Sequence, residues 1–235
     1  MMEEIQPRIQ KRIRSPRSAA LAGILFSGLI VASMLLLSNT TTQSPVEISR
    51  EWLGARANTV SIALGLVPFA GIAFFWFTGV IRDHIGERED RFFATVFLGS
   101  GIAYVVLLFI FAATIGAVFG TYTLADDLLV DGDIYIFGFM FMNEILGNYI
   151  LRIAGVYMLS IGTIWNRAEV MPRWLTIITY IVALVFLFFA VSIREARYVF
   201  PAWVFLTSVY ILIANRRLER REESNSPSNA QVKAS

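Results

Sequence analysis

Long apolar stretches alternate with short polar segments along the whole chain. A helix needs about 20 largely apolar residues to cross about 30 Å of hydrocarbon, because it rises about 1.5 Å per residue. Six stretches reach or approach that length: Ser18–Leu37, Thr59–Ile81, Phe92–Phe119, Ile134–Trp165, Trp174–Ile193 and Val199–Ala214. The pattern predicts an all-α, polytopic transmembrane helix bundle with six spans.

Two of the six stretches depart from the ideal length. The fourth is too long for one perpendicular crossing, so we expect it to tilt, to extend beyond the lipid or to begin with a separate surface segment. The sixth is short, but Tyr198 and Trp203 can anchor it at a membrane interface. Within the second stretch, Pro68 is expected to kink the helix because it cannot donate a backbone hydrogen bond.

Small residues in the third stretch predict close packing of a neighbouring helix. Gly99, Ser100 and Gly101 form a smooth patch, and Gly116 and Gly120 form a GxxxG pattern.

Basic residues precede the first stretch, as they do in a secretory signal peptide. The apolar run is about 20 residues, however, whereas a cleavable signal has roughly 7 to 15. Ser38-Asn39-Thr40 also lacks the small-x-small pattern of a cleavage site. We therefore expect a retained helix.

The distribution of Lys and Arg predicts the orientation, because cytoplasmic loops carry the excess. If residues 1–17 face the cytoplasm, the inner segments hold 15 Lys and Arg and the outer segments hold four. With an even number of crossings, both termini are predicted to be cytoplasmic. Residues 1–17 are then a basic tail, residues 18–214 the transmembrane domain, and residues 215–235 a second tail. That tail is expected to be disordered from Glu219 onward, because it lacks apolar periodicity.

Composition excludes several classes of protein. Of the 235 residues, 56% are hydrophobic and 16% are charged, whereas a soluble domain has roughly 45 to 50% and about 25%; a water-soluble globular enzyme is therefore excluded. The chain has no Cys and one His, which argues against disulfides and against Cys- or His-rich metal centres. Neither Lys follows a Gly, so a phosphate-binding P-loop is absent. We expect no cofactor, and the net charge of +2 is too small to indicate nucleic acid.

The most informative polar residues lie in the fourth stretch. At about 100° per residue, Glu144, Asn148 and Arg152 share one helix face with Gly155. A charge inside a bilayer costs about 2.5 to 3.5 kcal/mol, so the stripe is expected to face the bundle interior. Helical side chains lean toward the N-terminus, so Arg152 can reach Asn148 and Asn148 can reach Glu144. The three residues are our candidate intramembrane polar site.

Three interpretations of this stripe stay open. The stripe lines a polar cavity in which Glu144 is a proton or cation site, with a pKa set by burial against Arg152. Alternatively, it joins helices by hydrogen bonds to polar side chains of its neighbours, such as Ser100, Tyr104, Thr179, Tyr180 or Tyr210. In the third interpretation the span starts late, and Glu144 sits at the outer interface.

Two further groups of charged residues are weaker candidates. The inner loop Arg82–Arg91 carries mixed charges and His84, which suit a solvated turn better than a partner site or a pH sensor. The outer Asp126, Asp127, Asp131 and Asp133 could attract a divalent cation, but their spacing does not match a calcium loop.

A basic segment at each end, a charged second loop and six apolar stretches together resemble uncharacterised six-span integral membrane proteins of bacteria. This resemblance covers most of the chain as architecture and implies an inner (plasma) membrane location, although the residues alone also fit an organelle membrane. It implies no particular activity.

Three classes of function follow. The first is a multi-pass protein that moves or senses a small solute or ion along the fourth helix, in contact with the lipid bilayer and as a homo-oligomer or with a membrane partner. The second is a structural or regulatory subunit that binds a cytoplasmic partner through residues 82–91 and the C-terminal tail. A membrane-embedded enzyme ranks third, because no catalytic motif is present.

Overall fold

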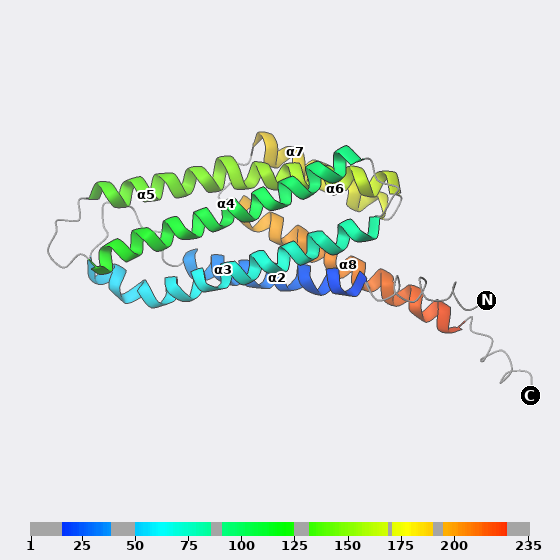
Figure 1. Ribbon diagram of the computed structural model, residues 1–235, viewed down its shortest axis with the longest axis horizontal. Helices are drawn as coiled ribbons and strands as arrows, with labels where there is room; N and C mark the ends of the chain where they lie inside the picture. The colour runs from blue at the N-terminus through cyan, green and yellow to red at the C-terminus, as the bar shows by residue number, and fades with distance from the viewer. Residues whose placement is uncertain are drawn as a thin grey trace, which may run out of the picture.

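The computed structural model of the chain describes residues 16–38, 50–85, 91–124, 132–168, 171–189 and 195–224. These residues form helices and contain no strand. The helices are α2 (Pro16–Ser38), α3 (Arg50–Ile85), α4 (Arg91–Leu124), α5 (Gly132–Glu144), the π-helix η3 (Ile145–Ile150), α6 (Leu151–Ala168), α7 (Arg173–Phe188) and α8 (Ala196–Ser224). Since α5, η3 and α6 follow one another without a break, they form one long rod (Figure 1).

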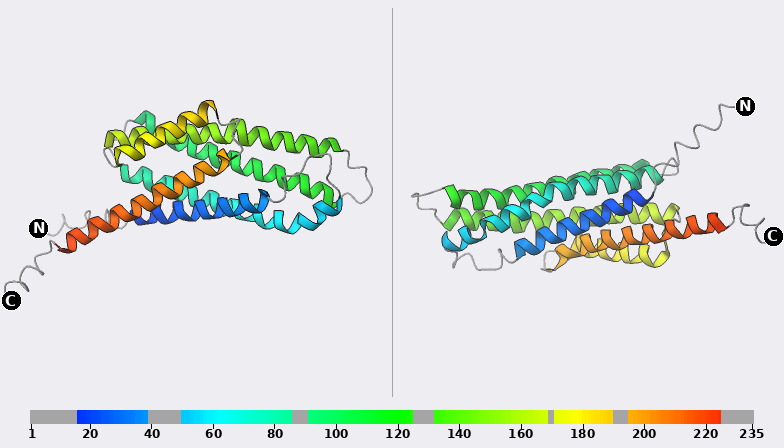
Figure 2. Two further views of the ribbon diagram at one scale, coloured as in Figure 1. Left: turned by 180° about the vertical axis from the view of Figure 1, so that it is seen from behind. Right: turned by 90° about the horizontal axis from the view of Figure 1, so that it is seen from below.

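The helices lie along one axis in a single elongated bundle, and α2, α3, α4, the rod, α7 and α8 alternate in direction (Figure 1). α2 packs against α3 and α8, α4 packs against α3 and the rod, and α7 packs against α6. Figure 2 shows that α7 stops and α8 begins about midway along the rod, whereas α3, α4 and the rod continue to the far end. The start of α2 and the end of α8 lie toward the same end of the bundle.

Five helical segments are long and apolar enough to cross a membrane. They are Arg17–Ser38, Gly54–Arg82, Phe92–Thr121, Ile136–Arg167 and Ala196–Arg216. α7 is also apolar but has only 16 residues, or about 24 Å of helix. The predicted all-α class is confirmed for the described residues, and five of the six predicted stretches lie in helices of sufficient length.

The predicted fifth stretch, Trp174–Ile193, is too long. α7 ends at Phe188, and Phe189 leaves the helical region with φ −126° and ψ −3°. No Gly or Pro marks this end in the sequence. Instead, the Leu187 carbonyl accepts a hydrogen bond of 3.3 Å from Nε of Arg152. Arg152 thus provides the Leu187 carbonyl with a hydrogen-bond donor, which the backbone N–H groups of a longer α7 would otherwise have provided.

The last helix is longer than predicted. α8 continues to Ser224, so the first part of the predicted tail is helical. Its sequence there is dominated by Arg and Glu, which are good helix formers. The remainder of that tail, the basic N-terminal residues before Pro16 and the loop residues 86–90 lie outside the described part of the chain.

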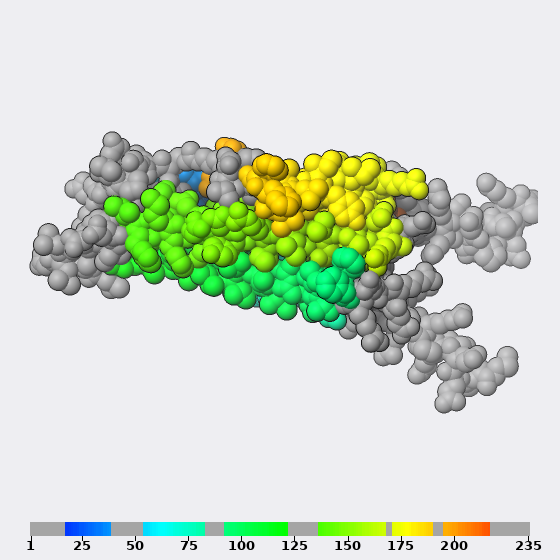
Figure 3. Space-filling view, turned by 90° about the horizontal axis from the view of Figure 1, so that it is seen from above, coloured from blue at the N-terminus to red at the C-terminus, as the bar shows by residue number. Residues whose placement is uncertain are grey.

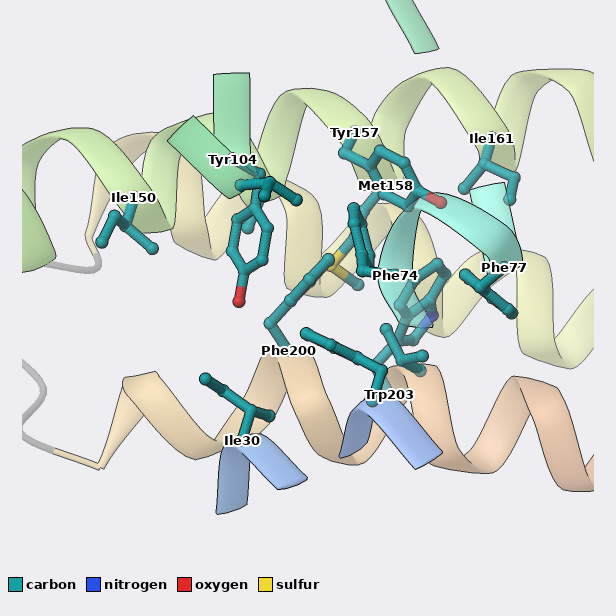
Figure 4. Close-up of a cluster of buried hydrophobic side chains, with 14 of the residues drawn as sticks. Ile30, Phe74, Phe77, Tyr104, Ile150, Tyr157, Met158, Ile161, Phe200 and Trp203 are labelled. Carbon is teal, nitrogen blue, oxygen red and sulfur yellow. The ribbon is translucent and has the colours of Figure 1, made fainter. Parts of the chain in front are cut away.

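The core is built on aromatic rings from five helical segments (Figure 4). Phe74 of α3 lies at the centre, with its ring centroid 4.9 Å from Phe26, 5.1 Å from Tyr104, 5.2 Å from Tyr157 and 5.8 Å from Phe200. All five side chains are at most 2% exposed. Because each such pair contributes about 0.5 to 1.5 kcal/mol beyond its buried area, this cluster fixes how α2, α3, α4, α6 and α8 sit against one another.

Hydrogen bonds between helices accompany the aromatic cluster. The hydroxyl groups of Thr78 and Tyr157 lie 3.0 Å apart, which joins α3 to α6. Nε1 of Trp203 donates to Oγ1 of Thr179 over 2.9 Å, which joins α8 to α7. In a bilayer such bonds replace the water that a soluble protein would offer.

Pro68 lies inside the continuous helix α3. Proline leaves a carbonyl in the preceding turn without its usual donor, and Ser or Thr side chains commonly compensate in membrane helices. The carbonyl that Pro68 leaves without a donor is that of Leu64, four residues earlier. Ser33 of α2 donates to the preceding carbonyl, that of Ala63, over 2.7 Å, so α2 is hydrogen-bonded to the backbone of α3 next to this gap.

Glycines allow close helix contact mostly at other places than those the sequence suggested. A Cβ atom on Gly101 would lie 3.2 Å from the Tyr157 ring, which confirms close packing there, whereas Gly99 and Gly120 face open space. A Cβ atom on Gly155 would lie 2.9 Å from the Ala183 carbonyl oxygen. α6 and α7 therefore meet almost backbone to backbone.

We expect Gly155→Ala to destabilise the protein by about 1 to 3 kcal/mol, because the added methyl group forces α6 and α7 apart. Unfolding in detergent micelles, followed by circular dichroism, measures the change. Gly99→Ala is the matched control and should be neutral or slightly stabilising, since alanine is the better helix former. Equal stability of the two variants would contradict the close α6–α7 contact.

Candidate functional site

The candidate site lies where the long rod changes from α-helix to π-helix. Glu144 is the last residue of α5, Asn148 lies within η3, and Arg152 is in the first turn of α6. The Leu151 amide donates to the Leu146 carbonyl, five residues earlier, which is the π pattern. Such π-turns inside helices are rare and occur frequently at functional sites.

The three side chains form a continuous ladder of hydrogen bonds. Nδ2 of Asn148 donates to Oε1 of Glu144 over 2.5 Å. Nη1 of Arg152 donates to Oδ1 of Asn148 over 2.5 Å and to the Asn148 carbonyl over 3.0 Å. The amide thus joins a carboxylate to a guanidinium, which are too far apart along the helix to pair directly. These are the contacts that the four-residue spacing predicts.

The prediction that the whole stripe faces the bundle interior is wrong for this chain. Glu144 is exposed, and Asn148 and Arg152 are half-buried. The buried face of α6 carries large side chains instead, among them Tyr157 and Met158. The aromatic core occupies that interior, so the stripe lies along the side of the rod next to α7.

Glu144 continues an exposed apolar face of α5. Phe137, Met140 and Phe141 are 70%, 62% and 42% exposed, and the rings of Phe137 and Phe141 are stacked with centroids 5.9 Å apart. The carboxylate of Glu144 therefore lies beside exposed apolar side chains.

The Arg152 end of the ladder contacts α7. Arg152 holds the Leu187 carbonyl through Nε, one of the last carbonyls of α7, where a cation is also favoured by the helix dipole. None of the five neighbouring side chains proposed as partners forms a bond to the ladder. Thr179, for example, accepts from Trp203, and the Tyr180 hydroxyl donates to Thr163 over 3.2 Å. Sequence reasoning missed Leu187 because a backbone carbonyl leaves no signal in the residue type.

The surface beside the ladder changes along the rod. Figure 3 shows α7 lying on α6 and covering one half of the rod, whereas the half formed by α5 is not covered by α7. Arg152 therefore lies at the boundary between the two halves, at the end of α7.

The height of the ladder can be compared with α2, whose candidate span of 22 residues matches the thickness of a bilayer at about 33 Å. Phe26 of α2 and Tyr157 of α6 both contact Phe74. Counting along the helices from these rings, Ser38 lies about 18 Å, Arg152 about 7.5 Å and Glu144 about 20 Å toward the same end. Glu144 is thus level with the end of α2, and Arg152 lies about 10 Å below it. This geometry favours the third interpretation for Glu144.

The other candidate groups cannot be placed. His84 and the four outer Asp side chains lie outside the residues whose side chains are described. Within the described part of the chain, no group of three or more His, Cys, Asp or Glu residues could hold a metal ion.

Comparisons with known proteins do not identify a relative. The chain matches no protein-family model, no curated protein and no solved structure. Its apolar helices are compatible with a membrane protein, and any finer function has to be argued from the site itself.

We expect Asn148 and Arg152 to be energetically coupled. In a double-mutant cycle with Asn148→Ala and Arg152→Gln, the coupling free energy should be about 0.6 to 2 kcal/mol, the range for polar contacts in membrane helices. Unfolding of the two single variants and the double variant in micelles provides the measurement. If the unfolding free-energy changes of the two single variants add up to that of the double variant, Asn148 and Arg152 are not coupled.

Proposed function

We propose that this chain is a multi-pass protein of the inner (plasma) membrane, with six spans and both termini in the cytoplasm, that moves or senses a small solute or ion. The path enters from the outer side at Glu144 and follows Asn148 to Arg152. The observation that carries the proposal is the hydrogen-bonded ladder on the π-helix, which starts level with the end of α2.

The arrangement of arginines supports the orientation. Arg17, Arg82, Arg167, Arg173 and Arg216 lie at one end of the helices, near the start of α2 and the ends of α6 and α8. An excess of Arg and Lys at one end is typical of the cytoplasmic side. α7, at 16 residues, counts as the fifth span if the bilayer thins locally or if flanking polar groups reach the interface.

The chemistry of the ladder suits a path for a small charged species. Oε2 of Glu144 accepts no hydrogen bond within the described part of the chain, so an arriving proton or cation can bind there without breaking a bond. Protonation of Glu144 weakens its charge-assisted bond from Asn148. Asn148 can then turn its amide, which changes the hydrogen bonds available to Arg152.

Glu144→Gln and Arg152→Ala should each reduce flux by about tenfold or more, because each removes a bond to a charged group worth about 1.5 to 3 kcal/mol. The purified protein is placed in vesicles of phosphatidylethanolamine and phosphatidylglycerol. Entrapped dyes then record proton and chloride movement after a potassium diffusion potential is imposed.

The matched control for this assay is Asn143→Ala. Asn143 is exposed and donates only to the Phe139 carbonyl of its own helix, over 2.8 Å, so its loss should leave flux unchanged. The proposed path is rejected if all three variants insert normally and conduct like the parent protein, or if no variant, the parent included, moves any ion.

The orientation is tested separately by labelling with thiols. Since the chain has no Cys, Lys11→Cys, Asp131→Cys and Lys233→Cys each carry a single thiol. A membrane-impermeant maleimide added to intact cells should react with the thiol at 131 and spare those at 11 and 233 until the membrane is opened. Reaction of only one of the two terminal thiols in intact cells would exclude an even number of spans.

A further inference from the structure

A second arginine lies at the outer end of α8. Arg197 is in the first turn of that helix, and its Nε atom is buried without any hydrogen-bond partner. The guanidinium carbon lies 5.0 Å from the centre of the neighbouring Tyr198 ring. A buried N–H group without an acceptor costs about 1 to 3 kcal/mol, and more when it belongs to a charged group. The position therefore calls for an acceptor.

Arg197 and Arg152 lie at nearly the same height in the bundle. The rings of Tyr157 on α6 and Phe200 on α8 are 5.9 Å apart, and both helices run in the same direction (Figures 1 and 2). Arg152 is five residues before Tyr157, and Arg197 is three residues before Phe200. At about 1.5 Å per residue, the two arginines differ in height by only about 3 Å.

Both arginines lie at the level where α7 stops and α8 begins. This level is closer to the middle of the bundle than the outer end of α2 is. The Leu187 carbonyl in the last turn of α7 is held by Arg152, and α2 extends about 10 Å farther. Helix ends inside hydrocarbon are tolerated only where protein or water satisfies their polar groups. Water or lipid headgroups are therefore expected to reach the end of α7.

Neither arginine has its charge balanced within the described residues. Arg152 binds only neutral oxygens, those of Asn148 and Leu187. Neither guanidinium forms an ion pair with Glu144 or Glu195, although both carboxylates are exposed. Charged groups in membrane spans nearly always have a partner, so two unbalanced cations at one height indicate a missing anion.

We propose that Arg152 and Arg197 bind a phosphate group at the outer end of α7. Inorganic phosphate carries between one and two negative charges at neutral pH, so it matches two cations better than one carboxylate does. The phosphodiester of a phospholipid headgroup carries one negative charge, but it also offers several acceptor oxygens to the two guanidinium groups. The planar guanidinium presents paired N–H donors that fit such an oxyanion. The phosphate belongs either to a small soluble anion or to the headgroup of a phospholipid.

This inference deepens the proposed function by naming the chemical class bound at the inner end of the path, and only its role in transport rests on that proposal. Binding itself is measured at equilibrium and needs no flux. If the protein binds phosphate but conducts nothing, the phosphate site is supported and the proposed path is rejected. If the protein conducts but does not bind phosphate, the phosphate site is rejected.

The experiment compares Arg197→Gln with Arg216→Gln, a matched variant in which an exposed arginine at the opposite end of α8 is replaced. Calorimetric titration with inorganic phosphate, in a neutral maltoside detergent, tests the soluble source. Native mass spectrometry with phosphatidylglycerol tests the lipid source. We expect affinity for at least one of the two probes to fall by about tenfold or more in Arg197→Gln and to change less than about twofold in Arg216→Gln.

Each outcome decides the proposal. Loss of phosphate binding in Arg197→Gln supports a soluble ligand, and loss of phosphatidylglycerol binding alone supports a headgroup. Absence of binding in the parent protein, or equal binding in the two glutamine variants, overturns the site. Arg197→Lys keeps the charge but not the paired donors, so if Arg197→Gln fails to fold, a lysine variant that binds both probes as tightly as the parent protein also overturns it.

Discussion

A helix that stops inside a bilayer exposes its last carbonyl groups to hydrocarbon, and this constraint governs the half of the molecule that contains the end of α7. α7 stops after 16 residues, at a height where α2 continues for about 10 Å. The guanidinium of Arg152 holds the Leu187 carbonyl, and a cation there also opposes the negative end of the helix dipole. Arg152 is in turn held by Asn148, and Asn148 contacts Glu144. The need to satisfy the end of α7 thus explains why polar residues lie on the neighbouring rod.

The other half of the molecule depends on packing. Phe74 contacts rings from α2, α4, α6 and α8, while Gly155 lets α6 and α7 approach until their backbones nearly touch. Lipid tails are as apolar as these side chains, so burial alone does not hold the helices together. Specific ring contacts, close glycine contacts and a few hydrogen bonds such as Thr78 with Tyr157 have to do so. Buried aromatic side chains fill this half, which leaves the side of the rod next to α7 as the place for polar chemistry.

Much of the fold and of the candidate site could be predicted from the sequence, because hydropathy and helical spacing are local properties. The apolar stretches and the order Glu144, Asn148, Arg152 follow from residue type and a period of about 3.6. The end of α7 could not be predicted, since it involves a backbone carbonyl and a side chain from another helix. The exposure of Glu144 was only one of three interpretations of the sequence. The sequence could not select it, because the interior is occupied by aromatic side chains that lie far apart in the sequence. The height of Arg197 beside Arg152 depends on how α6 and α8 align, which ring contacts determine.

The ladder and the arginine pair place a negative group and two positive groups one after the other along the bundle. An exposed carboxylate lies at the level of the end of α2, and two guanidinium groups lie about 10 Å closer to the middle of the bundle, with no counter-ion among the residues that the structure describes. In the path that we propose, an anion approaching from outside would meet repulsion from Glu144 first, and protonation of that carboxyl group would remove the repulsion. The same protonation would weaken the hydrogen bond between Glu144 and Asn148, which would let the amide adjust as Arg152 accepts the anion. Under this proposal, proton binding at Glu144 and phosphate binding at the end of α7 favour one another, because the hydrogen-bonded ladder connects Glu144 to Arg152.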